Sequence, residues 1–169
     1  MALAQLSGVT NEEIKLGMAS FHGVDRRFDF KLKTDKVVYL SDYAHHPEEI
    51  RQSILSMRAL YQDKKITAVF QPHLYTRTRD FYQEFADSLS LLDEVILTDI
   101  YPARELPIEG VSSELIYNHL RAGIEKTLCT KEEVLDVLRN KHIEVLITLG
   151  AGDIENYASN ICEILKEKC

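Results

Sequence analysis

Two short stretches of the sequence concentrate side chains that could bind anions or exchange protons. Residues 41–47 read S-D-Y-A-H-H-P, and residues 70–80 read F-Q-P-H-L-Y-T-R-T-R-D. Each stretch follows a short apolar run and precedes a helix-like pattern. Carboxylate, imidazole, phenol and guanidinium groups at such positions could hold an anionic substrate and stabilise the charge that develops during group transfer.

Some of these groups also have a purely structural interpretation. Asp42 could cap the turn that follows it, because Pro47 and the two glutamates behind it are ordinary residues for a helix start. Arg77 and Arg79 differ, since positive side chains at a helix N-terminus oppose the helix dipole. They are locally unfavourable unless an anion lies beside them, so we predict an anion site. Residues 150–152, G-A-G, lack the full G-x-G-x-x-G fingerprint, and we interpret them as a tight turn.

The histidines allow one alternative class, a metal-dependent hydrolase. His45 and His46 could bind zinc together with Asp42 or His73, but no H-E-x-x-H spacing supports this, and we predict no metal ligands. A second alternative, a stand-alone nucleotide- or phosphate-binding module, would use the same residues without catalysis. The sequence contains no G-x-x-x-x-G-K-[ST] phosphate loop and no G-x-S-x-G nucleophile elbow. An ATP-binding loop is therefore missing from this chain.

Length and composition favour one folded domain with at most a small appendage. The chain has 169 residues, of which 45% are apolar and 28% are charged, and this is enough to bury one sizeable core. Its net charge of −7 argues against a nucleic-acid partner, which would need a basic surface. No apolar run approaches the roughly 18 residues of a membrane span, and the first residues lack the features of a signal peptide. We therefore expect a cytoplasmic protein without a membrane partner.

Apolar periodicity predicts strands and helices in alternation. Strands are expected at the apolar runs 37–40, 66–70, 94–97 and 144–149, with a weaker one at 127–129. Residues 28–32 alternate and lead through a turn at Thr34-Asp35 into the first run, which predicts an antiparallel hairpin. Helices are expected after Thr10, over 50–61, over 81–92, over 131–140 from a capping box at Thr130 and Glu133, and from about Asp153 onward. This order predicts an α/β fold with a doubly wound, mostly parallel sheet and an N-terminal antiparallel strand.

Such a fold would bring the chemically active residues to one edge. Ligands of doubly wound sheets bind beyond the carboxyl ends of the strands, where helix N-termini also point. Four predicted strand-end loops meet there and offer Asp42, Tyr43, His45, His46, His73, Tyr75, Arg77, Arg79, Asp99 and Arg104. An ordinary surface edge does not usually collect so many of these groups, so we predict a functional crevice.

Four motifs, taken together, resemble one enzyme family. They are G-V-D-R-R-F-D at 23–29, D-Y-A-H-H-P at 42–47, F-Q-P-H-L-Y-T-R-T-R-D at 70–80 and D-I-Y-P-A-R-E at 99–105. Their order and spacing resemble the C-terminal domain of the Mur ligases, the ATP-dependent ligases of bacterial peptidoglycan synthesis. The Q-P-H-x-Y-T-R-T-R element is similar to the branch that joins L-alanine to UDP-N-acetylmuramate, and it favours that branch over the related ligase that recycles murein tripeptide.

The resemblance implies how the chain fits into a larger enzyme. Mur ligases have an N-terminal domain for the UDP-sugar, a central domain with the ATP phosphate loop, and a three-layer, Rossmann-like C-terminal domain. Residues 1–25 would be the end of the central domain, and residues 26–169 would be the C-terminal domain. ATP and Mg²⁺ would be bound mainly by the central domain. We therefore expect no cofactor and no activity in this chain by itself.

The resemblance also implies the reaction and its partners. ATP phosphorylates the lactyl carboxylate of UDP-N-acetylmuramate, and the amine of L-alanine then attacks the acyl phosphate, so that ADP and phosphate are released. The partners would be these small-molecule substrates and the N-terminal and central domains of the same enzyme.

Individual residues match family positions with known roles. The matching catalytic positions are Arg27, Asp42, His45 and His73, of which Arg27 and Asp42 would contact the nucleotide. The matching substrate-binding positions are Tyr43, His45, His46, His73, Tyr75, Arg77 and Arg79. The sequence departs from the family at Leu74, where many members have an arginine. The contact of that arginine would be absent, or it would come from another residue such as Arg79.

Overall fold

A six-stranded mixed sheet forms the centre of the protein. The computed structural model describes residues 2–21 and 23–169. The strands are β1 (Asp29–Lys33), β2 (Val38–Asp42), β3 (Ile66–Phe70), β4 (Glu94–Leu97), β5 (Glu125–Leu128) and β6 (Val145–Leu149), in the spatial order β1-β2-β6-β3-β4-β5. β1 pairs antiparallel with β2, and every other neighbouring pair is parallel. This confirms the predicted hairpin and the mostly parallel sheet.

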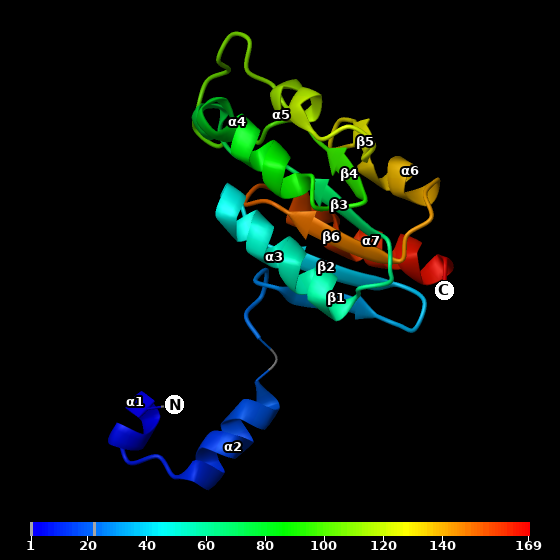
Figure 1. The fold of residues 1–169 in the computed structure, drawn as a ribbon. Coiled ribbons are helices and arrows are strands. Elements are labelled where there is room, and N and C mark those ends of the chain that lie inside the picture. The colour runs from blue at the N-terminus through cyan, green and yellow to red at the C-terminus, as the bar shows by residue number, and fades with distance from the viewer. Residues whose placement is uncertain (1, 22) are drawn as a thin grey trace.

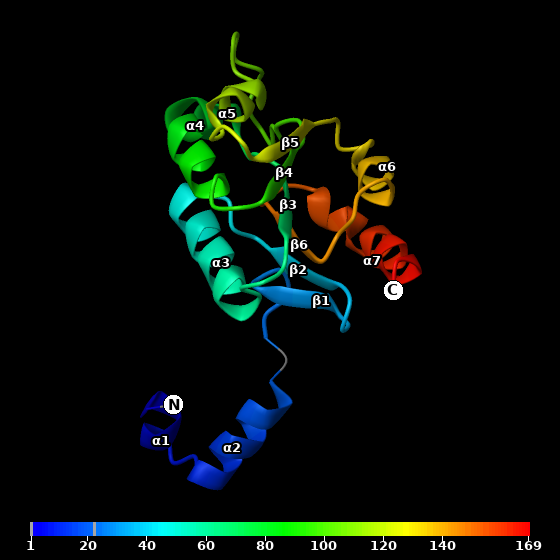
Figure 2. The ribbon, with the colours of Figure 1, turned by 45° about the vertical axis from the view of Figure 1, so that its right-hand side comes forward.

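Helices cover both faces of the sheet and complete three layers. α3 (Pro47–Leu60), α4 (Tyr75–Leu89) and α5 (Glu114–His119) lie on one face, and α6 (Val134–Arg139), the 3₁₀ turn η1 (Ile154–Tyr157) and α7 (Ala158–Glu167) lie on the other (Figures 1 and 2). The chain steps outward from β2 through β3 and β4 to β5, and then returns to insert β6 between β2 and β3. The fold is therefore doubly wound and Rossmann-like, as predicted.

Two apolar cores hold the layers together. β3 and β6 are buried at every position, as expected for central strands of a parallel sheet. Neighbouring strand residues face opposite sides, so Leu40 packs into the core beneath α3 and α4, whereas Tyr39 packs into the core beneath α6 and α7. On α3 the predicted helical spacing is confirmed, because Ile50, Ile54 and Met57 are all fully buried.

Several details of the sequence prediction were wrong. The helix predicted over 81–92 is α4, which begins earlier, at Tyr75, and ends at Leu89. The short helix α5 was not predicted, because only Ile116 of its six residues is buried and no apolar period develops. β5 lies at 125–128 instead of 127–129, since it is an edge strand with a weak apolar pattern. The helix predicted from 131 begins at Val134. The amide of Thr130 does donate to the Glu133 carboxylate at 2.8 Å, but residues 131–133 form a turn.

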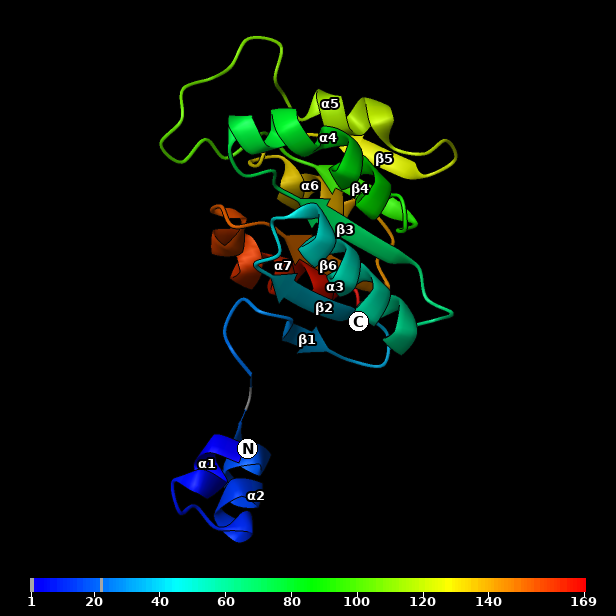
Figure 3. The same ribbon diagram turned by 60° about the vertical axis from the view of Figure 1, so that its left-hand side comes forward.

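The N-terminal segment stands apart from the sheet. α1 (Ala2–Leu6) and α2 (Asn11–Ser20) lie beyond β1 and outside the layers (Figures 1 and 3). α2 begins at the predicted capping box, in which Thr10 and Glu13 bond reciprocally. Neither helix has a buried residue. Met1 and His22, which belong to the segment 1–25 expected to come from another domain, lie outside the described residues. No helix in the described part of the chain is long and apolar enough to cross a bilayer.

A buried ion-pair network fastens the amino ends of the strands. Glu94, at the start of β4, is 1% exposed, and its carboxylate pairs with the ammonium groups of Lys65, at 3.0 Å, and Lys141. It also accepts a hydrogen bond from Thr67 of β3 at 3.2 Å. Burial acts to raise the pKa of Glu94, but the two lysines outweigh it and hold the pKa below its usual 4.5.

We expect Glu94→Gln to lower the unfolding free energy by about 3 kcal/mol near neutral pH, because two half-buried ammonium groups lose their carboxylate. A carboxylate whose pKa is lowered by folding stabilises the protein above its unfolded pKa, and this contribution is lost as the pH falls through the folded pKa. The difference in unfolding free energy between wild type and Glu94→Gln should therefore narrow below pH 4.5. Urea unfolding at several pH values measures it.

The matched control is Glu125→Gln, which removes the other partner of Lys65. The Glu125 side chain is 64% exposed, so this variant should change stability by less than about 1 kcal/mol. A stability gap for Glu94→Gln that stayed constant from neutral to acid pH would contradict the ion-pair explanation.

Candidate functional site

Four loops meet at the carboxyl edge of the sheet, as the strand order requires. Backbone hydrogen bonds connect them directly: Gly150 donates to Asp42 at 3.3 Å, Gln71 donates to Leu149 at 3.0 Å, and Tyr101 donates to Pro72 at 2.8 Å. The loops after β2, β3, β4 and β6 therefore form one continuous surface. This is the edge at which the sequence placed the functional crevice.

The glycines after β6 make room for a buried glutamine. Gln71 is 1% exposed, its amide group donates to Asp153 at 2.9 Å, and its carbonyl oxygen accepts from the amide of Ile154 at 3.0 Å. A Cβ atom at Gly150 would lie 2.7 Å from the backbone oxygen of Gln71, and one at Gly152 would collide with the Gln71 side chain. The G-A-G turn is thus structural, in agreement with its interpretation from the sequence.

Four rings line the edge in sequence from β2 to β4, and we call them the aromatic row: Tyr43, His45, His73 and Tyr101. The ring centroids are 5.2 Å apart for Tyr43 and His45, 6.1 Å for His45 and His73, and 5.6 Å for His73 and Tyr101, whose rings are stacked. Aromatic rings at these centroid distances pack favourably against one another. The row thus brings together Tyr43, His45 and His73, three of the predicted site residues.

Arg77 carries a positive charge to the aromatic row. It projects from the first turn of α4, and its Nη1 atom lies 3.5 Å from Nδ1 of His73. Within residues 2–21 and 23–169, Arg77 makes no ion pair with a carboxylate. Burial and the charges of Arg77 and His45 lower the pKa of His73 below its usual 6.5. The site therefore combines a free guanidinium with an imidazole that is neutral near physiological pH.

A second, smaller hollow adjoins the row. It has a volume of about 210 Å³ and is lined by Arg27, Phe28, Asp42, Tyr43, Ala44 and Glu49. Asp42 accepts hydrogen bonds from the hydroxyl of Ser53 and, at 3.4 Å, from the amide of Ala44. The hollow therefore contains a guanidinium, which could pair with a phosphate, and a carboxylate, which could accept a hydrogen bond from a hydroxyl. Phosphate and hydroxyl groups are the polar groups of a nucleotide.

The positive charge at the start of α4 is partly balanced by carboxylates of the protein itself. Glu105, from the loop after β4, accepts hydrogen bonds from the amide of Thr76 at 3.0 Å and from its hydroxyl at 2.5 Å. Arg79 pairs with Asp80 at 2.8 Å. The sequence argument that two arginines at this helix start require a bound anion was therefore wrong in its reason, because carboxylates of the chain supply negative charge. The unpaired state of Arg77 is the better reason for an anion site.

Other predicted site residues lie away from the aromatic row. His46 is exposed, and its ring packs against Phe81 at 5.2 Å, in a hollow between α3 and α4. Arg79 is exposed beside Asp80. Tyr75 lines a hollow of about 830 Å³, which it shares with Asp99 and the loop after β4. None of the aromatic row and no cation line that hollow. Substrate roles for these three residues stay predictions.

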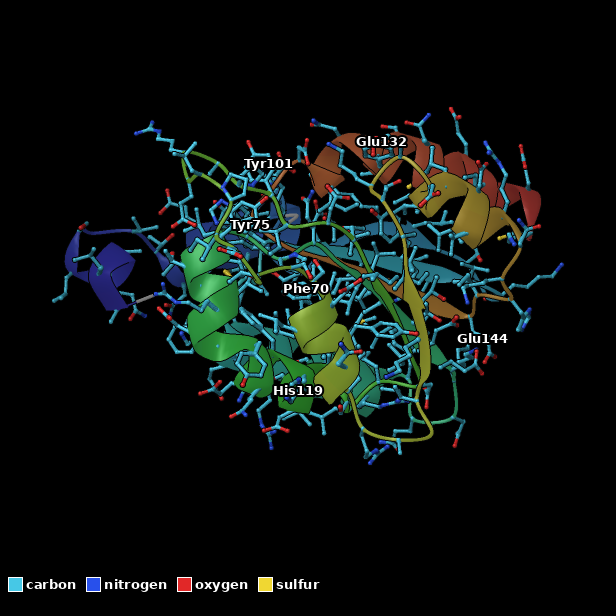
Figure 4. All side chains as sticks on the ribbon, turned by 90° about the horizontal axis from the view of Figure 1, so that it is seen from above. Phe70, Tyr75, Tyr101, His119, Glu132 and Glu144 are labelled. Carbon is cyan, nitrogen blue, oxygen red and sulfur yellow. The ribbon has the colours of Figure 1, made fainter. Side chains whose placement is uncertain are left out.

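Sequence reasoning missed two contributors to the site. The Arg26 guanidinium lies over the Tyr43 ring at 4.8 Å and donates to the carbonyl of Gly152 at 3.2 Å. Tyr101 stacks on His73, and Figure 4 labels it near Tyr75. Both belong to motifs that were recognised, but the double arginine at 26–27 gave no sign of which one faces the row. Among the described residues, no three His, Cys, Asp or Glu side chains are grouped as metal ligands.

The fold and the edge site together define a doubly wound α/β domain with a cationic crevice at the carboxyl ends of its strands. A family model described as the Mur ligase, glutamate ligase domain matches residues 26–159. The chain therefore belongs to the Mur ligase family, and the resemblance seen in the sequence is confirmed.

Curated relatives extend the match over nearly the whole chain. The chain is 79% identical over 168 residues to the UDP-N-acetylmuramate--L-alanine ligase of Phocaeicola vulgatus, which covers 99% of this chain and 37% of the relative. It is 59% identical over 165 residues to the ligase of the same name from Parabacteroides distasonis, of which it covers 36%. The chain thus spans a little over a third of the length of these relatives.

Solved structures agree with this assignment. The UDP-N-acetylmuramate-alanine ligase MurC of Thermotoga maritima superposes with a TM-score of 0.79 at 26% identity, over 99% of this chain and 36% of that chain. A domain of a putative UDP-N-acetylmuramate:L-alanyl-gamma-D-glutamyl-medo-diaminopimelate ligase from Haemophilus ducreyi has a TM-score of 0.60 at 20% identity, over 82% of this chain and 99% of that chain. The second likeness shows the fold alone.

We expect Arg77→Ala to raise the pKa of His73 toward its usual 6.5, because the substitution removes one of the charges that disfavour the imidazolium. NMR titration of the His73 ring protons measures this in the isolated chain. The matched control is Arg79→Ala, because Arg79 is paired with Asp80 at the surface. This variant should leave the pKa of His73 unchanged. If His73 titrates identically in wild type and Arg77→Ala, the two side chains do not interact in solution.

Proposed function

We propose that this chain is the C-terminal domain of an ATP-dependent ligase that joins L-alanine to UDP-N-acetylmuramate through an acyl phosphate. In this proposal residues 1–25 are the end of the central domain, and residues 26–169 form the C-terminal domain. The observation that carries it is the unpaired Arg77 beside the neutral His73, in a chain that is 79% identical to a ligase of that name.

L-alanine is the substrate that this domain would recognise. Its carboxylate is its one charged group when the amine is neutral, and a guanidinium can pair with a carboxylate through two parallel hydrogen bonds. Arg77 is free to do this. A neutral His73 does not compete for the carboxylate and can accept a hydrogen bond from the alanine amine, which has to be uncharged to attack. Tyr43 and His45 would bound the pocket on the β2 side of the row.

The nucleotide would lie in the smaller hollow. When bound, ATP supplies the phosphoryl group that activates the lactyl carboxylate of UDP-N-acetylmuramate. Arg27 would pair with its phosphates, and Asp42 would hold a polar group of the nucleotide in the same hollow. ATP and Mg²⁺ would be held mainly by the central domain, because this chain has no phosphate loop. Since ATP drives the reaction, we assign the whole protein to the cytoplasm.

The N-terminal segment supports a larger enzyme. Leu3, Leu6 and Leu16 are 78%, 85% and 72% exposed, and Met18 and Phe21 are exposed as well. Apolar side chains gathered on two short helices are unfavourable in water. We propose that the central domain of the same enzyme covers them. A murein peptide ligase from Psychrobacter arcticus is only 17% identical, so nothing specific favours the recycling reaction.

A chimera tests the proposed function. We expect the Phocaeicola vulgatus ligase to stay active when its matching third is replaced by this chain, because 79% identity preserves most contacts between domains. ADP release should require both UDP-N-acetylmuramate and L-alanine. The isolated chain is the control, and it should show no ligase activity, since it lacks the phosphate loop. ADP release that does not depend on L-alanine in a folded chimera would overturn the proposal.

In the same chimera, Arg77→Ala should lower kcat/KM for L-alanine about 30- to 1000-fold, because a charged hydrogen-bond partner of the substrate carboxylate is lost. Arg77→Lys should restore part of the loss, since an ammonium keeps the charge but not the bidentate geometry. Steady-state kinetics with each substrate varied in turn measure this. An unchanged alanine response, or an increase in KM for ATP instead, would place Arg77 on the nucleotide side.

A further inference from the structure

The helix that carries Arg77 begins in an unusual way. Leu74, at the N-cap position of α4, has φ 74° and ψ 134°, and its side chain cannot accept a hydrogen bond. A branched residue in this region of backbone space is strained and persists only where surrounding structure holds it. Helices normally satisfy their first amides through an N-cap side chain such as Ser or Asp. α4 has no such residue, so its start depends on groups from elsewhere.

The loop after β4 supplies these groups. Leu74 donates its amide to the carbonyl of Tyr101 at 2.9 Å, and Tyr101 donates to Pro72 at 2.8 Å, so the loop continues the pairing of β3 with β4. Four residues further along, Glu105 accepts from the amide and hydroxyl of Thr76. Glu105 is itself held in a turn, because its amide donates to Pro102 at 2.9 Å. The same short segment thus stacks a ring on His73 and caps the helix of Arg77.

We propose that Glu105 is a positioning residue for the alanine site, because its carboxylate fixes the first turn of α4 and so the separation of Arg77 from His73. This inference rests on the proposed function for its substrate, L-alanine, but not for its geometry. Glu105 acts through Thr76, the residue directly before Arg77, and would not itself touch the substrate.

Electrostatics agree with this role. Glu105 lies close enough to His73 to favour the charged imidazole, and so it opposes burial, Arg77 and His45, which lower the pKa of His73. The hydroxyl and amide of Thr76 lower the pKa of Glu105 itself. The capping group is therefore an anion throughout the physiological range, and it partly balances the positive helix start without pairing with Arg77.

Kinetics in the chimera test the positional part. Glu105→Ala should raise KM for L-alanine about tenfold, with KM for ATP unchanged, because the first turn of α4 loses the side-chain cap that Glu105 supplies. Glu105→Gln should stay within about threefold of wild type, since an amide oxygen can still accept from Thr76. Glu109→Ala is the matched control in the same loop, where Glu109 is exposed. A purely structural cap would lower thermal stability in Glu105→Ala without changing KM for L-alanine, and that result would overturn the proposal.

NMR of the isolated chain tests the geometry independently of any activity. Both Glu105→Ala and Glu105→Gln should lower the pKa of His73, because each removes the negative charge. Only Glu105→Ala should also shift the amide resonances of Thr76 and Arg77. Unchanged spectra and an unchanged His73 titration in Glu105→Ala would overturn the proposal. An inactive chimera with the expected NMR changes would instead count against the proposed function and leave the positioning role supported.

Discussion

The insertion of β6 between β2 and β3 is the constraint on which the site depends. The last strand of the chain pairs in parallel with β2 and β3, which lie far earlier in the sequence. Its following loop is therefore held between the loops that carry the histidines. This is why Arg26 can donate to Gly152, 126 positions away, while lying over the ring of Tyr43. Without β6 in this place, the loop that follows it would not lie beside the loops that carry the aromatic row.

The two edges of the sheet differ in how their charged side chains are paired. At the amino edge, which carries Glu144 and lies away from Tyr75 and Tyr101 in Figure 4, the buried carboxylate of Glu94 is fully paired. At the carboxyl edge, neither Arg27 nor Arg77 forms an ion pair within the described part of the chain. A cation without a carboxylate partner at this edge is preorganised to receive an anion. The protein thus carries a local positive site despite a net charge of −7.

Backbone strain is concentrated at the same edge. Among residues 2–21 and 23–169, the non-glycine residues with positive φ are Arg26, Phe28, Leu74 and Ala103, and all of them lie in loops that approach or form the crevice. Each such conformation costs about 1–3 kcal/mol and has to be held by its surroundings. The hydrogen bonds from Leu74 to Tyr101 and from Tyr43 to Arg26, at 2.9 and 2.6 Å, show how the loops hold one another. The strain therefore belongs to the arrangement of the site.

The sequence by itself determined the fold class and the four loops that meet at the carboxyl edge of the sheet. Apolar runs such as 66–70 and amphipathic helices of 14 and 15 residues give strong local signals, whereas the short α5 and the edge strand β5 give weak ones. Only the tertiary structure decided which side chains meet. His45 joins the aromatic row and its neighbour His46 does not, because adjacent side chains leave the backbone in different directions. Glu105 caps α4 through Thr76, 29 positions before it, and a contact of that range depends on strand order, which leaves no local pattern to read.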